Sequence, residues 1–161
     1  MMTALLIVHG LLAVALLGAV THQALAAVWP LRAAAAPGQR SFFDRFRGVN
    51  GPAYANAVVI LFVITFIIGG IIYPAYRLNV RTYLQDYRML GAEGLFEIKE
   101  HLTAIALALL PFYWFLWKRP VATEQGQAFA RAAVTTMIAV AAWWSFFAGH
   151  ILNNIRGLFG T

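Results

Sequence analysis

The sequence predicts an all-α integral membrane protein, a four-helix bundle with up-down topology. Of its 161 residues, 61% are hydrophobic and 11% are charged, whereas soluble domains carry about 45–50% apolar and about 25% charged residues. The mean hydropathy is +0.72. A helix needs about 20 residues to cross about 30 Å of hydrocarbon, and four apolar runs reach that length, near residues 3–28, 54–76, 95–117 and 130–152. The chain length predicts a single domain, residues 1–161.

The run 3–28 is expected to be a retained helix rather than a cleaved secretory signal. It has no basic region before it, and it exceeds the about 7–15 apolar residues of a signal peptide. The next run, 54–76, follows Pro52, which suits the first turn of a helix because its missing N–H is not needed there. Pro74 near the exit of that run and Pro111 within 95–117 predict kinks.

Three polar connections separate the runs, and their cationic residues indicate the orientation. The connection Arg77–Gly94 repeats apolar residues at helical spacing, so we expect it to lie on the membrane surface. Lysines and arginines at 77, 81, 88, 99 and 156 share a side with both termini, whereas the larger set at 32, 40, 45, 47, 118, 119 and 131 lies opposite. Because cationic residues are in excess on the cytoplasmic side, we expect both termini in the periplasm, with the chain in a bacterial inner membrane.

Charge and composition exclude several classes of function. The net charge of +6 comes from residues at the ends of apolar runs, a pattern that indicates topology and contact with the lipid bilayer rather than nucleic acid as a partner. Trp114 and Trp117 fit an aromatic belt at one interface. The chain has no cysteine, which excludes thiolate metal sites, cysteine-ligated iron–sulfur clusters and haem attached through thioethers.

Histidines give the main indication of function. His9, His101 and His150 lie near the ends of three different runs, on the side of the termini. An imidazole within a membrane is costly unless it faces the interior of a bundle and has a partner. The three residues therefore predict a shared ligand. His22 lies about 140° around the helix from His9, and its role stays open.

A b-type haem would account for these histidines. It needs axial imidazoles, an apolar slot for the macrocycle and cationic groups near its propionates. His9 and His150 are the preferred ligands because each stands next to a glycine, with His101 the next choice. The glycines expected to form the slot are Gly10, Gly69, Gly70 and Gly149. The propionates are expected to face arginines on the same side of the membrane, which are Arg77, Arg81, Arg88 and Arg156.

Two alternatives remain open at this level. His9, His101 and His150 could together bind copper, iron or zinc, with Glu97 as a fourth ligand. Glu97 and His101 are four residues apart and share a helix face. The chain could also be an accessory subunit of a respiratory or photosynthetic complex, with no chemistry of its own.

A resemblance to a group of membrane proteins rests on three short segments, Val8-His9-Gly10, Lys99-Glu100-His101 and Gly149-His150. With them, the chain resembles small four-helix membrane b-type cytochromes and related haem-binding membrane oxidoreductases. The resemblance implies electron transfer through one haem b near the outer leaflet, in exchange with a quinone or a partner subunit. It leaves open whether the chain is an oxidoreductase itself, and whether it works in a larger membrane redox complex or a homo-oligomer.

Overall fold

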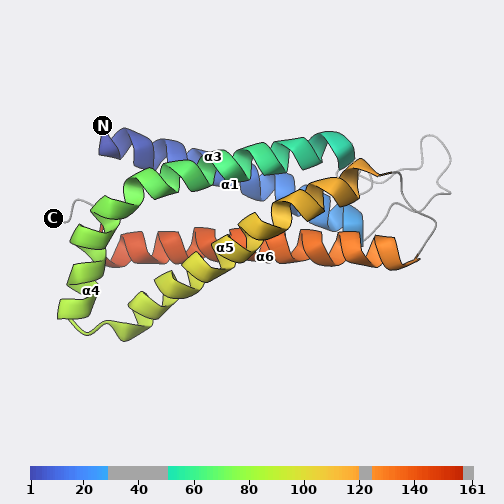
Figure 1. Cartoon of the computed structure of the whole chain (residues 1–161). Helices are drawn as coiled ribbons and strands as arrows, with labels where there is room; N and C mark the ends of the chain where they lie inside the picture. The colour runs from blue at the N-terminus through green and yellow to red at the C-terminus, as the bar shows by residue number, and fades with distance from the viewer. Residues whose placement is uncertain (29–50, 120–124, 158–161) are drawn as a thin grey trace, which may run out of the picture.

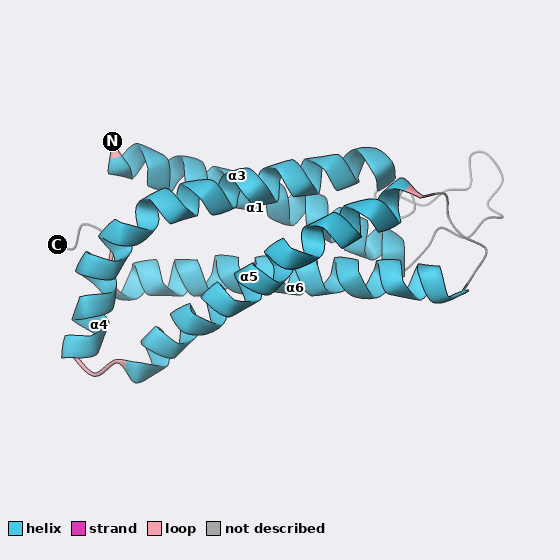
Figure 2. Cartoon of the chain, viewed as in Figure 1, coloured by secondary structure: helices cyan, strands magenta, loops and turns pink. Residues whose placement is uncertain are grey.

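The computed structural model describes residues 1–28, 51–119 and 125–157, and all its regular elements are helical (Figure 2). The all-α prediction is confirmed for this part of the chain. The predicted connection with its four arginines at 32–47 lies outside the described residues. The long helices are α1 (Met2–Val28), α3 (Gly51–Tyr76), α5 (Leu90–Lys118) and α6 (Gln125–Ile155).

The long helices of the described residues pack against one another, with α5 running obliquely to the others (Figure 1). Helix α1 packs against α3 and α6, and α5 packs against the same two helices. Successive long helices run in opposite directions, so the start of α1 and the end of α6 lie at the same end of the molecule (Figure 1). The histidines near those two helix ends are thereby brought to one end of the structure.

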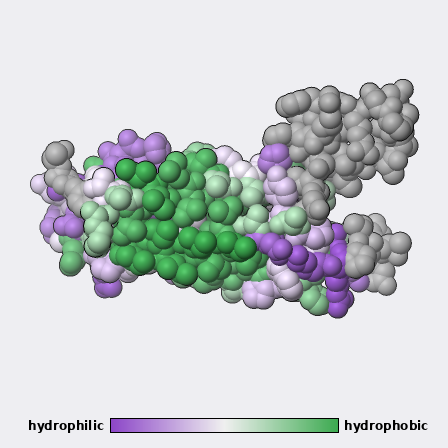
Figure 3. Space-filling view, turned by 90° about the horizontal axis from the view of Figure 1, so that it is seen from above, coloured by the Kyte–Doolittle hydropathy of each residue, from purple (hydrophilic) through white to green (hydrophobic). Residues whose placement is uncertain are grey.

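Within the described residues, three helical segments are long and apolar enough to cross a membrane, namely Met2–Val28, Gly51–Asp86 and Gly126–Ile155. They correspond to three of the four predicted runs. Helix α5 is not among them, and its first half carries Glu93, Glu97, Lys99 and Glu100. The surface shows a hydrophobic band with hydrophilic residues toward both ends (Figure 3). Large apolar side chains of the long helices are exposed, including Leu11, Ile60 and Val140.

The predicted surface connection after residue 76 begins as a continuation of α3. A π-helical turn, η1 (Arg77–Arg81), joins α3 to the short helix α4 (Thr82–Asp86). Pro74 lies inside α3 and removes one backbone donor, and single π turns inside helices accommodate such irregularities. Helix α4 consequently bends across the end of the other helices (Figure 1).

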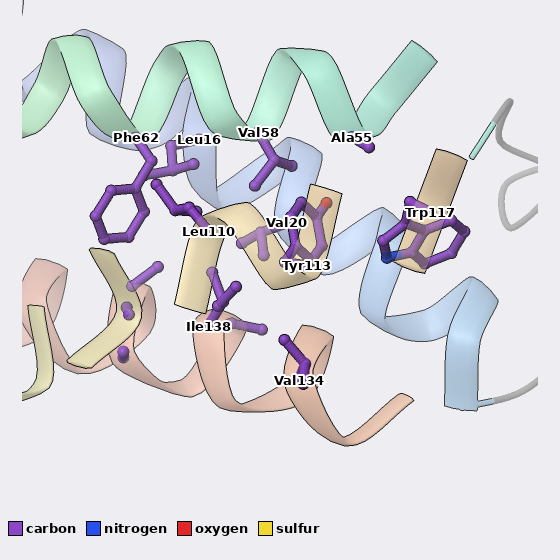
Figure 4. Packing of buried hydrophobic residues seen from close by; sticks show 14 of the residues in the cluster. Leu16, Val20, Ala55, Val58, Phe62, Leu110, Tyr113, Trp117, Val134 and Ile138 are labelled. Carbon is purple, nitrogen blue, oxygen red and sulfur yellow. The ribbon is translucent and has the colours of Figure 1, made fainter. Parts of the chain in front are cut away.

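The buried apolar residues form two clusters. The larger one joins all four long helices and is centred on residues with no exposed surface, such as Val20, Val58, Ala106 and Ile138 (Figure 4). The smaller one lies toward α4 and contains Ile72, Val80, Leu84, Ala92, Phe96 and Leu152. The amphipathic pattern after residue 76 is explained by this second cluster, because Val80 and Leu84 pack into it.

Two buried polar side chains within the larger cluster are hydrogen-bonded. The hydroxyl of Tyr113 donates to Oε1 of Gln23 at 2.6 Å, and Nε2 of Gln23 donates to the Gly51 carbonyl at 2.9 Å. Gln23 and Tyr113 have no exposed surface. Buried polar groups stabilise a fold only when they are paired in this way. The network ties α1, α3 and α5 together at the end opposite α4.

Trp117 is a core residue, which corrects its expected place in an aromatic belt. It is 7% exposed, and its indole N–H donates to the Thr135 hydroxyl at 2.9 Å. A side chain at Gly51 would come within 2.5 Å of this indole, so glycine at the start of α3 permits the close approach. Trp114 is 44% exposed, as a belt residue would be.

Candidate functional site

A cavity of about 610 Å³ lies between the two apolar clusters. The larger cluster contributes Leu16, Phe62 and Ala142 to its wall, and the smaller one contributes Ile72 and Phe96. The long helices all take part in the lining. Cavities of about 300–1,000 Å³ with mainly apolar walls and a few polar groups are typical ligand sites.

Most of the residues predicted to form a haem site line this cavity. They come from α1, α3 and α6 and are His9, Gly10, Gly69, Gly70, Gly149 and His150. The other predicted residues, which do not line it, are Arg77, Arg81, Glu97 and His101. The structure thus separates the preferred pair of histidines from the third.

His9 lies against the backbone of α3. A Cβ atom placed on Gly69 would stand 3.1 Å from Cε1 of the imidazole, which is tighter than ordinary van der Waals contact. The Nδ1 atom of His9 is buried and has no hydrogen-bond partner among the described residues. Glycine at position 69 therefore makes room for this imidazole.

The side chain of His150, which is exposed like that of His101, reaches the same cavity from α6, and α6 packs against α1. Its ring stacks parallel to the ring of Phe146, with centroids 6.5 Å apart and an interplanar angle of 5°. Phe146 itself lines the cavity. The two imidazoles are thus presented by neighbouring helices to one apolar space.

The three-histidine metal site is not assembled in the described residues. His101 is exposed, and Glu97 pairs with Arg81 at 3.3 Å rather than facing an imidazole. Arg81 also pairs with Glu93 at 3.2 Å, so its charge is already balanced by carboxylates of α5. Residues 1–28, 51–119 and 125–157 hold no group of three or more histidine or acidic side chains that could share a metal ion.

Several polar atoms on the cavity wall are buried without a hydrogen-bond partner. They are Nδ1 of His9, Oγ1 of Thr65, the hydroxyl oxygen of Tyr76 and Nε of Arg156. Most buried polar atoms in proteins are paired, and an unpaired one costs about 1–3 kcal/mol. Their collection around one space indicates a place for a ligand with polar groups of its own.

Sequence reasoning missed the role of Thr65, Tyr76 and Lys99, all of which line the cavity. Thr65 interrupts an otherwise apolar stretch from 57 to 72, and Lys99 lies within the predicted run 95–117. Polar and charged residues inside apolar runs are candidate functional residues in membrane proteins. The position of Thr65 and of Lys99 inside apolar runs could therefore have identified both as candidates.

Comparisons with protein-family models, with curated proteins and with solved structures find no match to this chain.

Proposed function

We propose that this chain is an integral membrane protein that binds one b-type haem in the cavity, with His9 and His150 as the axial ligands. One observation carries the proposal: two imidazoles from neighbouring helices line a single apolar cavity whose wall also holds unpaired polar atoms. Electron exchange with a quinone or a partner subunit is the function that such a site supports best.

The residues that line the cavity are compatible with a bound haem. Gly69 leaves room for the imidazole of His9, and the ring of His150 is held parallel to Phe146. Aromatic side chains add a flat wall, since the rings of Tyr76 and Phe96 stack with centroids 4.1 Å apart beside the cavity. Haem would supply one-electron redox chemistry, and the protein would supply position and environment.

The protein's own contribution is exclusion of water and control of charge. Apolar side chains such as Leu16 and Phe62 line the space, and a low-dielectric surrounding is one of the means by which proteins set a haem potential. The unpaired hydroxyls of Thr65 and Tyr76 are available as hydrogen-bond donors to a bound group.

The membrane arrangement is part of the same proposal. The exposed apolar band and the three membrane-length segments favour a transmembrane four-helix bundle with up-down topology. The excess of cationic residues at the opposite end favours periplasmic termini in a bacterial inner membrane, with the haem near the outer leaflet.

Absorbance of the purified protein tests the haem proposal. After expression with haem supply, we expect a Soret band in the detergent-solubilised protein and a reduced-minus-oxidised difference spectrum of the b type. Absence of any Soret band from well-folded protein would remove haem from the proposal and favour an accessory subunit. Metal analysis of the same sample would detect copper, iron or zinc bound without haem.

Gly69 and Gly70 provide a matched test of the cavity. A side chain at Gly69 would press on the imidazole of His9, whereas one at Gly70 meets nothing within 4 Å. Overpacking costs about 1–3 kcal/mol, so we expect Gly69→Val to weaken haem affinity by about fivefold to a hundredfold. Haem titration followed by absorbance measures this change.

Gly70→Val is the control, because both changes put the same β-branched residue into α3. We expect a much smaller loss of haem affinity from it, with equal helical content in both variants by circular dichroism. Equal losses in the two variants would contradict the placement of His9 against Gly69.

A further inference from the structure

Lys99 carries a positive charge into the cavity. It extends from α5 and lines the wall, and its Nζ atom stands 3.7 Å from the position that a Cβ on Gly149 would occupy. The ammonium lies 5.4 Å from the centre of the Phe96 ring, and it is a charged neighbour of His9. Within the part of the chain that the structure describes, no carboxylate lies within 4.0 Å of the Lys99 ammonium, and Glu100, which also lines the cavity, is its acidic neighbour.

Arg156 places a second cation on the same wall. It follows the last turn of α6, and its guanidinium stacks over the ring of Tyr83 at 4.7 Å. The Nε atom is buried with no hydrogen-bond partner. Arg156 is six residues beyond His150, about 9 Å farther along the helix direction. The cations therefore approach the cavity from α5 and from the end of α6.

We propose that Lys99 and Arg156 bind the carboxylate groups of the ligand in the cavity. The inference rests on the proposed function, in which those groups are the two propionates of haem. A cation among apolar walls is costly when unpaired, and a carboxylate offsets that cost through charge-assisted hydrogen bonds. The guanidinium of Arg156 has donors suited to a planar carboxylate.

This assignment keeps Arg156 from the four arginines expected near the propionates and adds Lys99. Arg81 is already paired with Glu93 and Glu97, and Arg77 is exposed and does not line the cavity. Lys99 and Arg156 are the lysine and arginine on the cavity wall within the described residues. The carboxylates of the ligand are therefore expected at these two side chains.

Haem and its dimethyl ester distinguish charge recognition from simple occupation of the cavity. The ester keeps the macrocycle and the iron but lacks both negative charges. Each compound is titrated into the full-length protein in detergent and followed by absorbance. We expect wild-type protein to bind haem more tightly than the ester, and we expect Lys99→Met and Arg156→Gln each to reduce haem affinity by about tenfold or more with little change for the ester.

Two further variants control for charge and for folding. Lys99→Arg keeps the positive charge and should retain the preference for haem over the ester. Arg77→Gln removes an exposed arginine outside the cavity and should leave both affinities unchanged.

The outcomes separate this inference from the proposed function. Loss of haem affinity with unchanged ester affinity in Lys99→Met and Arg156→Gln supports it. Unchanged haem affinity in both variants, or equal weakening of haem and ester, overturns the inference and leaves the haem proposal standing. Failure of the folded wild-type protein to bind either compound overturns both.

Discussion

Replacing His9 by alanine is expected to abolish stable haem binding, whereas replacing His101 by alanine is expected to leave it intact. His9 lines the cavity, lies against Gly69 and has an unpaired buried nitrogen. His101 does not line the cavity. Loss of one strong contact of about 1.5 kcal/mol or more corresponds to at least about tenfold in affinity. At haem concentrations near or below the wild-type dissociation constant, the Soret absorbance per protein should therefore fall.

The measurement is the haem-to-protein ratio of each purified variant, with helical content by circular dichroism as the check on folding. Added imidazole should restore a Soret band to His9→Ala, because a free imidazole fits the space that the side chain leaves. His150→Ala should lower the haem-to-protein ratio in the same way, since each of the two variants leaves one of the two proposed histidine ligands. A normal spectrum in His9→Ala, or loss of haem in His101→Ala alone, would refute the ligand assignment.

Replacing Tyr113 by alanine is expected to cause the largest loss of stability in the chain. Tyr113 has no exposed surface and donates to the equally buried Gln23. Removal of a large aromatic side chain from a core costs about 3–5 kcal/mol, and leaving Oε1 of Gln23 without its donor adds about 1–3 kcal/mol. The free energy of unfolding in detergent, followed by circular dichroism, measures the loss.

Two variants separate the contributions. Tyr113→Phe keeps the ring and removes only the hydroxyl, so it should lose about 1–3 kcal/mol. Phe112→Ala removes an aromatic ring from the next residue, which is 48% exposed, and should have a much smaller effect on unfolding. Similar losses from Phe112→Ala and Tyr113→Ala would show that the network around Gln23 does not stabilise this end of the molecule.

Helix positions could be predicted from the chain because they depend on local properties. Each apolar run is long enough to form a helix by itself, and the observed α1 (Met2–Val28) and α3 (Gly51–Tyr76) begin and end close to the predicted residues. The irregular passage through η1 could not be anticipated in this way. Its π turn comes shortly after Pro74, and Val80 and Leu84 pack into the smaller apolar cluster there.

The partners of individual side chains were much less accessible to sequence reasoning. Tryptophan is a typical residue of the membrane interface, yet Trp117 is a core residue. Its indole N–H donates to Thr135 on α6, and this partner could not be predicted from the sequence. Arg81 was expected at a ligand and is bound by Glu93 and Glu97 of α5. Such pairs form between helices, and no local pattern specifies them.

The sequence by itself determined an all-helical chain with membrane-length apolar segments, and it singled out His9 and His150 beside their glycines. Only the tertiary structure decided that these two histidines share a cavity with Lys99, while His101 stays outside it. Residues two apart on a helix point about 200° away from each other. The sequence of α5 does not specify how the helix is rotated about its own axis. Its packing against α3 and α6 therefore decides whether Lys99 or His101 faces the cavity.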